Sequence, residues 1–288
     1  MKLALGIFPN PEKEKVLAVL DYLLDVCAAE GIETFLPKSA ALGKACGIFD
    51  ERDAESMGKL KMAMSLGGDG TFLHAAQYAC LLDIPVCGVN IGRKGFLTEI
   101  ELPDIAAAIK KIAAAQYEIE ERYMLRSSVR RDGRVISDAS ALNDIVISKG
   151  TQTKLIRLSV NINNSLKGSY YSADGIVFAT ATGSTAYSLS AGGPIVHPSL
   201  PAIIITPISP HALSVRPLVI PAASEIAIKP VPPYNEMTLA NDGTTLTSVL
   251  PGDVVKVESS RYKSKFIRLG SASYYDTWQE RLQKGETI

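Results

Sequence analysis

Hydrophobic positions in the first 115 residues follow two alternating spacings. Short continuous apolar runs are typical of buried strands, and they lie at residues 3–8, 33–36, 61–66 and 85–90. Segments whose apolar residues recur every three to four positions are typical of amphipathic helices, and they lie at residues 12–30, 72–80 and 104–115. Strands that alternate with helices predict a parallel sheet, so we expect an α/β, Rossmann-like N-terminal domain. Residues 37–58 fit neither spacing and are expected to be irregular or weakly helical.

After about residue 117 the apolar positions recur at every second residue, as in 155–162 and 254–257. Turn-forming pairs recur at short intervals: Asp132-Gly133, Asn163-Asn164, Asp174-Gly175, Asp242-Gly243 and Pro251-Gly252. This pattern predicts a run of hairpins, hence an all-β-rich C-terminal domain, interrupted by one helix near 184–191. We expect an α/β domain at 1–120, a β-rich domain at 121–272, and a C-terminal helix in 273–288 that packs back.

Composition narrows the possible partners. Lys plus Arg and Asp plus Glu both number 30, and a net charge of zero argues against a general nucleic-acid or anionic-membrane binder. No stretch approaches the length of a membrane span, so we expect neither kind of partner. A local run of basic residues is interpreted as a solvated hairpin surface: Arg122, Arg126, Arg130, Arg131 and Arg134.

The cysteines and histidines favour a reduced, zinc-free protein. Cys27, Cys46, Cys80 and Cys87 lack metal-ligand spacing and are typical of a cytosolic chain, and the three histidines are dispersed. The apolar run at 3–8 ends at Pro9, too early for a signal peptide. We therefore expect a cytoplasmic location.

Residues Gly67-Gly68-Asp69-Gly70-Thr71 connect a predicted strand to a predicted helix. Such a loop places bare backbone N–H groups and a helix N-terminus beside one carboxylate, which suits a phosphate-handling site. The alternative is a glycine-rich turn whose Asp69 caps the helix.

Two further segments could contribute to a binding site. In Asn90 to Leu97, two glycines permit close backbone approach, and Arg93 and Lys94 could contact phosphate or could be ordinary solvated cations. Asn143-Asp144 places a polar pair inside an apolar run, so either a turn or a ligand must satisfy it.

The segment 174–194 is dense in small polar residues. A strand enters a Thr/Gly/Ser loop that opens a helix, with Ser184 or Thr185 as the expected N-cap. This second helix N-terminus could receive a phosphate or a ribose. Residues 241–244 are typical of a hairpin turn.

Together these segments resemble the NAD kinase family, in the family's order, from about residue 62 to 245. The glycine loop alone is shared with phosphofructokinases and lipid kinases, whereas 180–194 distinguishes the NAD kinases. The segments 95–97, with Gly92, and 209–220 also match. The resemblance implies an α/β domain and a β-rich domain with the active site between them.

The activity that the resemblance implies is transfer of a phosphoryl group from ATP, or polyphosphate in some members, to the 2′-hydroxyl of the adenosine ribose of NAD, giving NADP. It also implies a cytoplasmic homo-oligomer, a dimer or tetramer. A divalent cation, Mg²⁺ or Mn²⁺, is expected with the phosphoryl donor rather than at a dedicated protein site.

Carried over by position, the resemblance makes Asp69 the general base for the ribose hydroxyl. Asn143 would contact the adenine edge and Asp144 the ribose hydroxyls. The glycines that let the loop approach phosphates would be Gly67, Gly68 and Gly70. The other expected nucleotide-binding residues are Phe96, Asp174, Thr185, Ala186, Tyr187, Ser190 and, with a less defined role, Asp242.

Three positions depart from the family pattern. Asp144 stands where Glu is usual, Ala181 where Pro is usual, and Thr244 where Gln is frequent. The shorter Asp144 side chain puts its direct reach to a hydroxyl in doubt, and none of the three changes removes Asp69. The alternatives are a lipid or sugar kinase that shares the glycine loop and a non-catalytic pyridine-nucleotide sensor.

Overall fold

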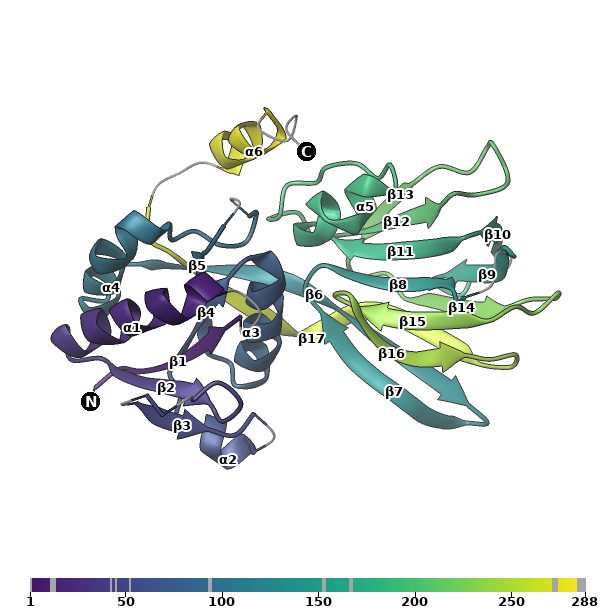
Figure 1. The fold of residues 1–288 in the computed structure, drawn as a ribbon. Coiled ribbons are helices and arrows are strands. Elements are labelled where there is room, and N and C mark those ends of the chain that lie inside the picture. The colour runs from purple at the N-terminus through teal and green to yellow at the C-terminus, as the bar shows by residue number, and fades with distance from the viewer. Residues whose placement is uncertain are drawn as a thin grey trace. The chain divides into compact units, whose positions relative to one another are not determined.

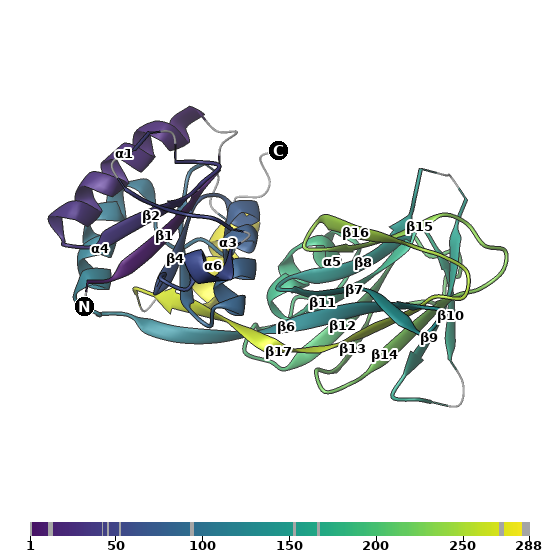
Figure 2. The same ribbon diagram turned by 90° about the horizontal axis from the view of Figure 1, so that it is seen from below.

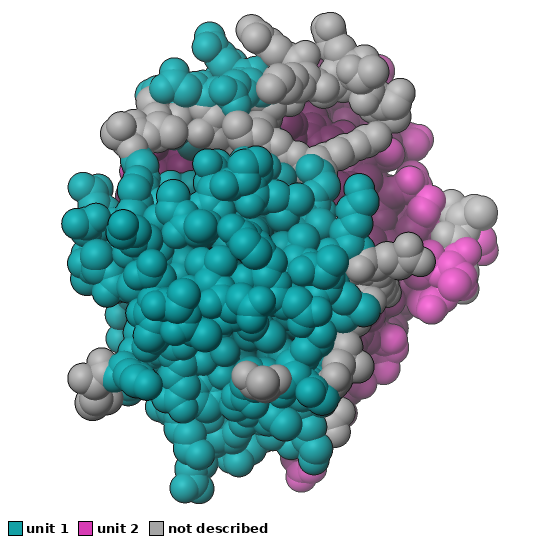
Figure 3. All heavy atoms as spheres, turned by 60° about the vertical axis from the view of Figure 1, so that its left-hand side comes forward, with its two compact units in different colours: residues 1–121, 264–288 teal, residues 122–263 magenta. Residues whose placement is uncertain are grey.

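The computed structural model describes residues 2–10, 14–41, 43–44, 46–51, 53–92, 95–151, 154–165, 168–270 and 274–283. The chain divides into two compact units, which are coloured separately in Figure 3. The first contains Met1–Glu121 and Ser264–Ile288, and the second contains Arg122–Lys263. Residues 264–272, which we expected in the β-rich domain, therefore group with the first unit.

The first unit is built on a parallel sheet in the order β3-β2-β1-β4-β5-β17. Its strands are β1 Ala4–Pro9, β2 Glu33–Pro37, β3 Gly47–Phe49, β4 Met62–Gly67, β5 Pro85–Asn90 and the end of β17 Val254–Arg268. Its helices are α1 Glu14–Ala29, α2 Ala54–Met57, α3 Asp69–Leu81, the 3₁₀-helix η1 Leu102–Asp104, α4 Ile105–Ala113 and α6 Tyr274–Gln283. The predicted α/β fold is confirmed, but β3 lies where we expected no strand.

The two faces of this sheet are packed differently. Helices α1 and α4 lie side by side over one face, where large apolar side chains such as Leu5, Met64 and Val89 form the core (Figures 1 and 2). On the face next to α3, β5 carries Gly88, where a Cβ would lie 2.8 Å from the Phe72 ring. Gly88 on β5 thus allows α3, which begins in the glycine loop, to pack closely against the sheet.

The second unit contains two antiparallel sheets. One has the order β13-β12-β11-β8-β15-β16, and the other the order β10-β9-β14-β17-β6-β7. Strands of the first are β8 Asp144–Lys149, β11 Gly175–Thr180, β12 Ala202–Ile208, β13 Leu218–Pro221, β15 Met237–Asn241 and β16 Thr244–Val249. Strands of the second are β6 Glu118–Arg131, β7 Arg134–Ala141, β9 Ile156–Ile162, β10 Ser169–Ala173, β14 Ile226–Pro230 and β17.

Apolar residues from both sheets share one core, which confirms the predicted β-rich domain. Ile145 and Ile147 of β8 face this core, whereas Val146 faces a smaller cluster with Ala181 and Val196. The side chains of a strand alternate between faces, so Asp144 lies on the Val146 side of β8. Two of the predicted hairpin turns are wrong. Asp174 connects β10 of one sheet to β11 of the other, and Pro251-Gly252 connects β16 of one sheet to β17 of the other.

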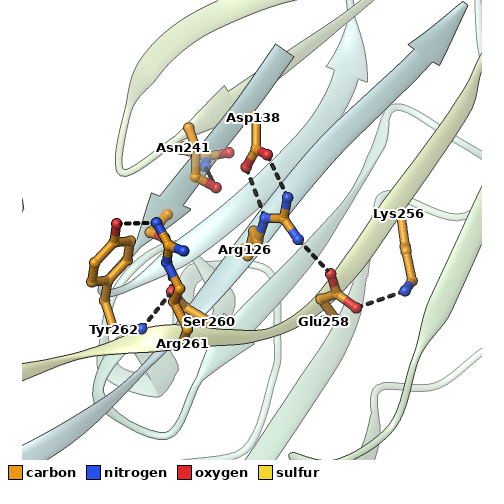
Figure 4. A network of polar contacts seen from close by, with 10 residues as sticks. Arg126, Asp138, Asn241, Lys256, Glu258, Ser260, Arg261 and Tyr262 are labelled. Atoms are coloured by element: carbon orange, nitrogen blue, oxygen red, sulfur yellow. Dashed lines mark hydrogen bonds and ion pairs between the residues drawn. The ribbon is translucent and has the colours of Figure 1, made fainter. Parts of the chain in front are cut away.

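The basic run is a solvated surface only in part, which corrects our interpretation: Arg130 and Arg134 are exposed, whereas Arg122 and Arg126 contact other parts of the protein. Arg126 forms a bidentate pair with Asp138 and a 3.0 Å contact with Glu258, which also pairs with Lys256 (Figure 4). Arg122 is buried, with 5% of its surface exposed. Acidic partners on β7 and β17 thus neutralise charge that the sequence shows on β6.

In the part of the chain that the structure describes, no helix combines the length and apolar character needed to cross a bilayer.

Candidate active site

The glycine loop of the first unit is very short. Strand β4 ends at Gly67, helix α3 begins at Asp69, and Gly68 is the extended N-cap residue between them. A Cβ on Gly67 would lie 2.3 Å from Thr71 Oγ1, so glycine is required for this close turn. The predicted order of strand, glycine loop and helix is confirmed, and the N-cap residue Gly68 itself provides no side-chain cap.

The carboxylate of Asp69 is held by the backbone of a second loop. Phe96 N–H donates to Oδ2 at 2.6 Å, and Leu97 N–H donates to Oδ1 at 3.1 Å. Asp69 is only partly buried. Each carboxylate oxygen has two lone-pair directions, so this fixed carboxylate can still accept a hydrogen bond from a ligand hydroxyl.

Gly95 makes this arrangement possible. A Cβ at this position would lie 2.0 Å from Asp69 Oδ1 and 2.8 Å from Oδ2. Glycine therefore lets the loop approach until its N–H groups reach the carboxylate. Phe96, a predicted site residue, contributes its backbone N–H here, whereas Arg93 and Lys94 lie outside the described residues.

In the second unit, Asp242 fastens the start of β8. Its carboxylate accepts hydrogen bonds from the N–H groups of Leu142 at 2.7 Å, Asn143 at 2.8 Å and Asp144 at 3.1 Å. Asp242 has φ 45° and Gly243 has φ 78°, as required for a tight hairpin turn between β15 and β16. The predicted hairpin is confirmed, and its aspartate also organises the Asn143-Asp144 pair.

Asp144 is a buried acid, with 5% of its surface exposed. Burial, together with the nearby negative charge of Asp242, raises its pKa to about 7, against the opposing effect of a hydrogen bond from Tyr187 N–H. Asn143 Oδ1 is also buried and accepts no hydrogen bond from a described residue. An unmet acceptor in a folded protein is costly, so this pair fits a polar ligand.

The loop after β11 packs directly on this pair. Thr180 Oγ1 donates to Leu142 O at 2.6 Å and accepts from Gly183 N–H at 2.9 Å. A Cβ on Gly183 would lie 2.1 Å from Asn143 O. Thr180 and Gly183 therefore fix how the loop lies against Asn143.

The expected helix cap is wrong. The loop forms the 3₁₀-helix η2 Thr182–Thr185 and the one-turn helix α5 Tyr187–Ser190, and neither has a side-chain cap. Ser184 Oγ instead donates to Ala181 O at 2.7 Å and accepts from Val196 N–H at 3.0 Å. The hydroxyl of Ser184 thus ties this loop to a later segment, and it does not start a helix.

The remaining predicted residues of this unit are distributed around that loop. Thr185 and Ala186 are half-buried, and Tyr187 and Ser190 are exposed. Asp174 pairs with Lys149 at 2.7 Å. Lys149 was missed because only the pairing of β8 with β11 brings it beside Asp174.

Sequence reasoning also missed a pocket in the first unit. It has a volume of about 460 Å³ and is lined by residues at the carboxyl ends of β1 and β2, by Glu51 after β3 and by α3. Its signal in the sequence is weak, because three of the four lining segments lie outside the motifs. For a metal, the described residues contain no group of three His, Cys, Asp or Glu side chains able to hold an ion.

Comparisons with known proteins agree with both units. The family model of the ATP-NAD kinase N-terminal domain matches residues 26–117, and that of the ATP-NAD kinase C-terminal domain matches residues 142–269. The NAD kinase of Moorella thermoacetica is 39% identical over 98% of this chain and 89% of its own length. That of Heliobacterium modesticaldum is 38% identical over 97% of this chain and 98% of its own length.

Solved structures show the same fold. Yeast NADH kinase complexed with NADH has a TM-score of 0.89 at 23% identity, covering 100% of this chain and 89% of its own. An NAD kinase from Archaeoglobus fulgidus in complex with ATP has a TM-score of 0.72 at 23% identity and full coverage of both chains. From the matches to both family models and to full-length relatives, the chain belongs to the ATP-NAD kinase family.

Proposed function

We propose that this protein transfers the terminal phosphoryl group of ATP to the 2′-hydroxyl of the adenosine ribose of NAD, forming NADP and ADP. The observation that carries the proposal is the fixed carboxylate of Asp69 at the start of α3, within a chain whose full-length relatives are NAD kinases. Asp69 accepts the proton of the 2′-hydroxyl. The ribose oxygen then bonds to the terminal phosphorus as the bond from that phosphorus to the bridging oxygen of ADP breaks.

Recognition of NAD falls to the second unit in this proposal. The unmet acceptor of Asn143 receives a hydrogen bond from the amino group of adenine, and Asp144 accepts from ribose hydroxyls. Thr185, Ala186, Tyr187 and Ser190 line the adenosine site, and Asp174 lies at the nicotinamide end. Asp242 acts through the backbone of β8, as its three hydrogen bonds support.

The cation and cellular setting belong to the same proposal. A divalent cation, Mg²⁺ or Mn²⁺, binds mainly through the phosphates of the donor. Such an ion offsets phosphate charge. The four cysteines are free thiols, as is usual in the reducing cytoplasm, and the protein acts there as a homo-oligomer.

The test is to incubate purified protein with magnesium, NAD and either ATP or polyphosphate. NADP should form, and its absence with every donor would refute the proposal. A lipid or sugar kinase would instead phosphorylate those acceptors, and a sensor would bind NAD without turnover.

Asp69→Asn tests the general base. Because a positioned base typically contributes about 10²–10⁴-fold, kcat should fall at least about 100-fold. The dissociation constant for NAD, measured by calorimetry, should change little. Asp104→Asn is the matched control, because Asp104 is an exposed acid of the same unit and should leave kcat unchanged. Substantial turnover by Asp69→Asn would mean that another group removes the proton.

A further inference from the structure

A buried arginine connects one sheet of the second unit to the loop after β11. Arg122 lies in the first half of β6, and its Nη1 donates a hydrogen bond to Thr182 Oγ1 at 3.3 Å. Only 5% of the surface of Arg122 and 7% of that of Thr182 are exposed. The two residues are 60 positions apart, and β6 and β11 belong to different sheets, so the tertiary fold sets this contact.

The short helix that contains Thr182 depends on contacts with the rest of the fold. This helix, η2, has four residues, and Ala181 before it supplies no side-chain cap. So short a 3₁₀ turn is marginal by itself, because its hydrogen bonds have poor geometry and few residues share the cost of starting it. Tertiary contacts therefore determine where η2 lies. Ser184 provides one of them through Val196, and Arg122 provides another from β6.

A shift of η2 would reach Asn143 directly. Gly183 follows Thr182, and a Cβ on Gly183 would lie 2.1 Å from Asn143 O and 2.6 Å from Asn143 Cα. The backbone of Asn143 is also held by Asp242, which accepts from Asn143 N–H at 2.8 Å. Groups packed this closely transmit a displacement, because an interior of crystal-like density has little space to absorb it. The contact of Arg122 with Thr182 thus bears on the position of Asn143.

The chemistry of the pair suits a fixed position. The guanidinium of Arg122 is planar and charged, and a hydrogen bond from a charged donor is stronger than one between neutral groups. Replacing buried charged groups with apolar side chains of similar size is often neutral or stabilising. A buried arginine is therefore weakly explained by stability alone, whereas a role in placing η2 accounts for its donor and for its burial.

We propose that Arg122 is a positioning residue of the nucleotide site: through its hydrogen bond to Thr182 it sets the position of η2 against Asn143, and thereby the affinity for NAD. This inference rests on the proposed function and adds a residue that acts through its neighbour, without touching the substrate. Phosphoryl transfer depends on Asp69 of the other unit, so the effect of Arg122 falls on the binding of NAD and not on kcat.

The experiment measures the dissociation constant for NAD by calorimetry, together with kcat and the KM values for NAD and ATP. Thr182→Val removes the acceptor and keeps the shape of the side chain, and Arg122→Gln removes the charged donor. Each should raise the dissociation constant and KM for NAD about tenfold, because a hydrogen bond from a charged donor is lost. The values of kcat and KM for ATP should change by less than about threefold, as expected when only the binding of NAD is weakened.

Three further variants make the test specific. The double variant should bind NAD no more weakly than the weaker single variant, because both changes break the same contact. Thr182→Ser keeps the hydroxyl and should bind NAD as the wild type does. Arg130→Gln is the matched control, because Arg130 is an exposed arginine of the same strand, and it should leave all of these constants unchanged.

Additive losses in the double variant would overturn the inference, because Arg122 would then act through another group. Wild-type affinity for NAD in both single variants would also overturn it, even if their melting temperatures fall, because the pair would then serve stability alone. If Arg122→Gln does not fold, Thr182→Val gives the answer by itself. Absence of NADP with the wild type and every donor would instead overturn the kinase function.

Discussion

Asp144 shows how one side chain can suit a ligand and destabilise the fold. It is buried beside Asp242, and its pKa is raised to about 7, whereas the unfolded chain loses this proton near pH 4. Between these values the folded protein binds more protons than the unfolded chain. The free energy of unfolding therefore falls as the pH rises through this window.

Asp144→Asn should remove this fall in the free energy of unfolding with rising pH. A neutral amide at this position keeps an acceptor for Tyr187 N–H and has no charge to bury. At pH 8 the free energy of unfolding should rise by roughly 2–4 kcal/mol, and at pH 4 it should change little. Denaturant titrations at both pH values measure the difference. An equal effect of the substitution at pH 4 and pH 8 would contradict the assigned pKa.

Asp138→Asn is the control of opposite sign. Its hydrogen bonds with Arg126 hold the pKa of Asp138 below its usual value, so the charged form stabilises the fold above that pKa. The substitution should therefore lower stability at pH 8, by no more than about 1 kcal/mol because the pair is partly exposed. The gain in stability at pH 8 should be seen for Asp144→Asn, because Asp144 is buried beside a second acid and not beside a cation.

At the scale of elements, locally determined features were predictable. The turn from β4 through Gly68 into α3 depends on glycine and on the helix that follows. Both can be recognised from about ten consecutive residues of the sequence. Strand β3 was not predictable, because it is three residues long and pairs with β2, where a Cβ on Gly47 would lie 2.3 Å from the Phe35 ring. Missing β3 also hid Glu51, which follows it.

The prediction of a helix cap in the loop after β11 was wrong for a related reason. Ser184 has the composition of an N-cap, but its hydroxyl contacts Val196, twelve residues later. The hydrogen bond from Asn143 N–H to Asp242, part of the clamp that the Asp242 carboxylate forms on the start of β8, spans an even longer stretch of sequence. Asp242 lies about a hundred positions after Asn143. A motif indicates which residues gather at a site, whereas tertiary pairing decides which of them touch.

Asp242→Asn tests the clamp between the β15–β16 hairpin and β8. Asn tolerates the same positive φ, so the turn should survive. One carboxylate oxygen becomes an NH₂ group that faces an N–H donor, which should cost about 1–3 kcal/mol of unfolding free energy. Asp132→Asn is the matched control, because Asp132 lies in an equivalent Asp-Gly turn between β6 and β7 and is exposed. Equal effects of the two variants would refute the clamp.

At the scale of the whole molecule, one unit is formed by a single continuous segment of the chain and the other by two separate segments. Arg122–Lys263 is one uninterrupted segment, whereas the first unit needs a return of the chain at Ser264. The returning strand pairs with β5 and buries Phe266 against Phe72, with ring centroids 4.8 Å apart. Arg268 adds ion pairs with Glu99 at 3.2 Å and Glu120 at 2.6 Å.

These contacts predict different behaviour of the isolated segments. Residues 122–263 should fold alone and unfold cooperatively, because both sheets and their shared core lie within them. Residues 1–121 lack Phe266 and Ile267, each at most 2% exposed in the full chain. Losing a buried aromatic side chain costs about 3–5 kcal/mol, a large part of the roughly 5–15 kcal/mol that holds a domain folded.

Thermal unfolding followed by circular dichroism should therefore show no cooperative transition for residues 1–121. Joining residues 264–283 to them through a flexible Gly/Ser linker should restore it, because the linker returns the missing strand to β5. The same linked polypeptide with Phe266→Ala should melt at a lower temperature than its unsubstituted parent. A cooperative transition in 1–121 alone would mean that the parallel sheet is complete at β5, and that the return of the chain adds a strand the first unit does not need.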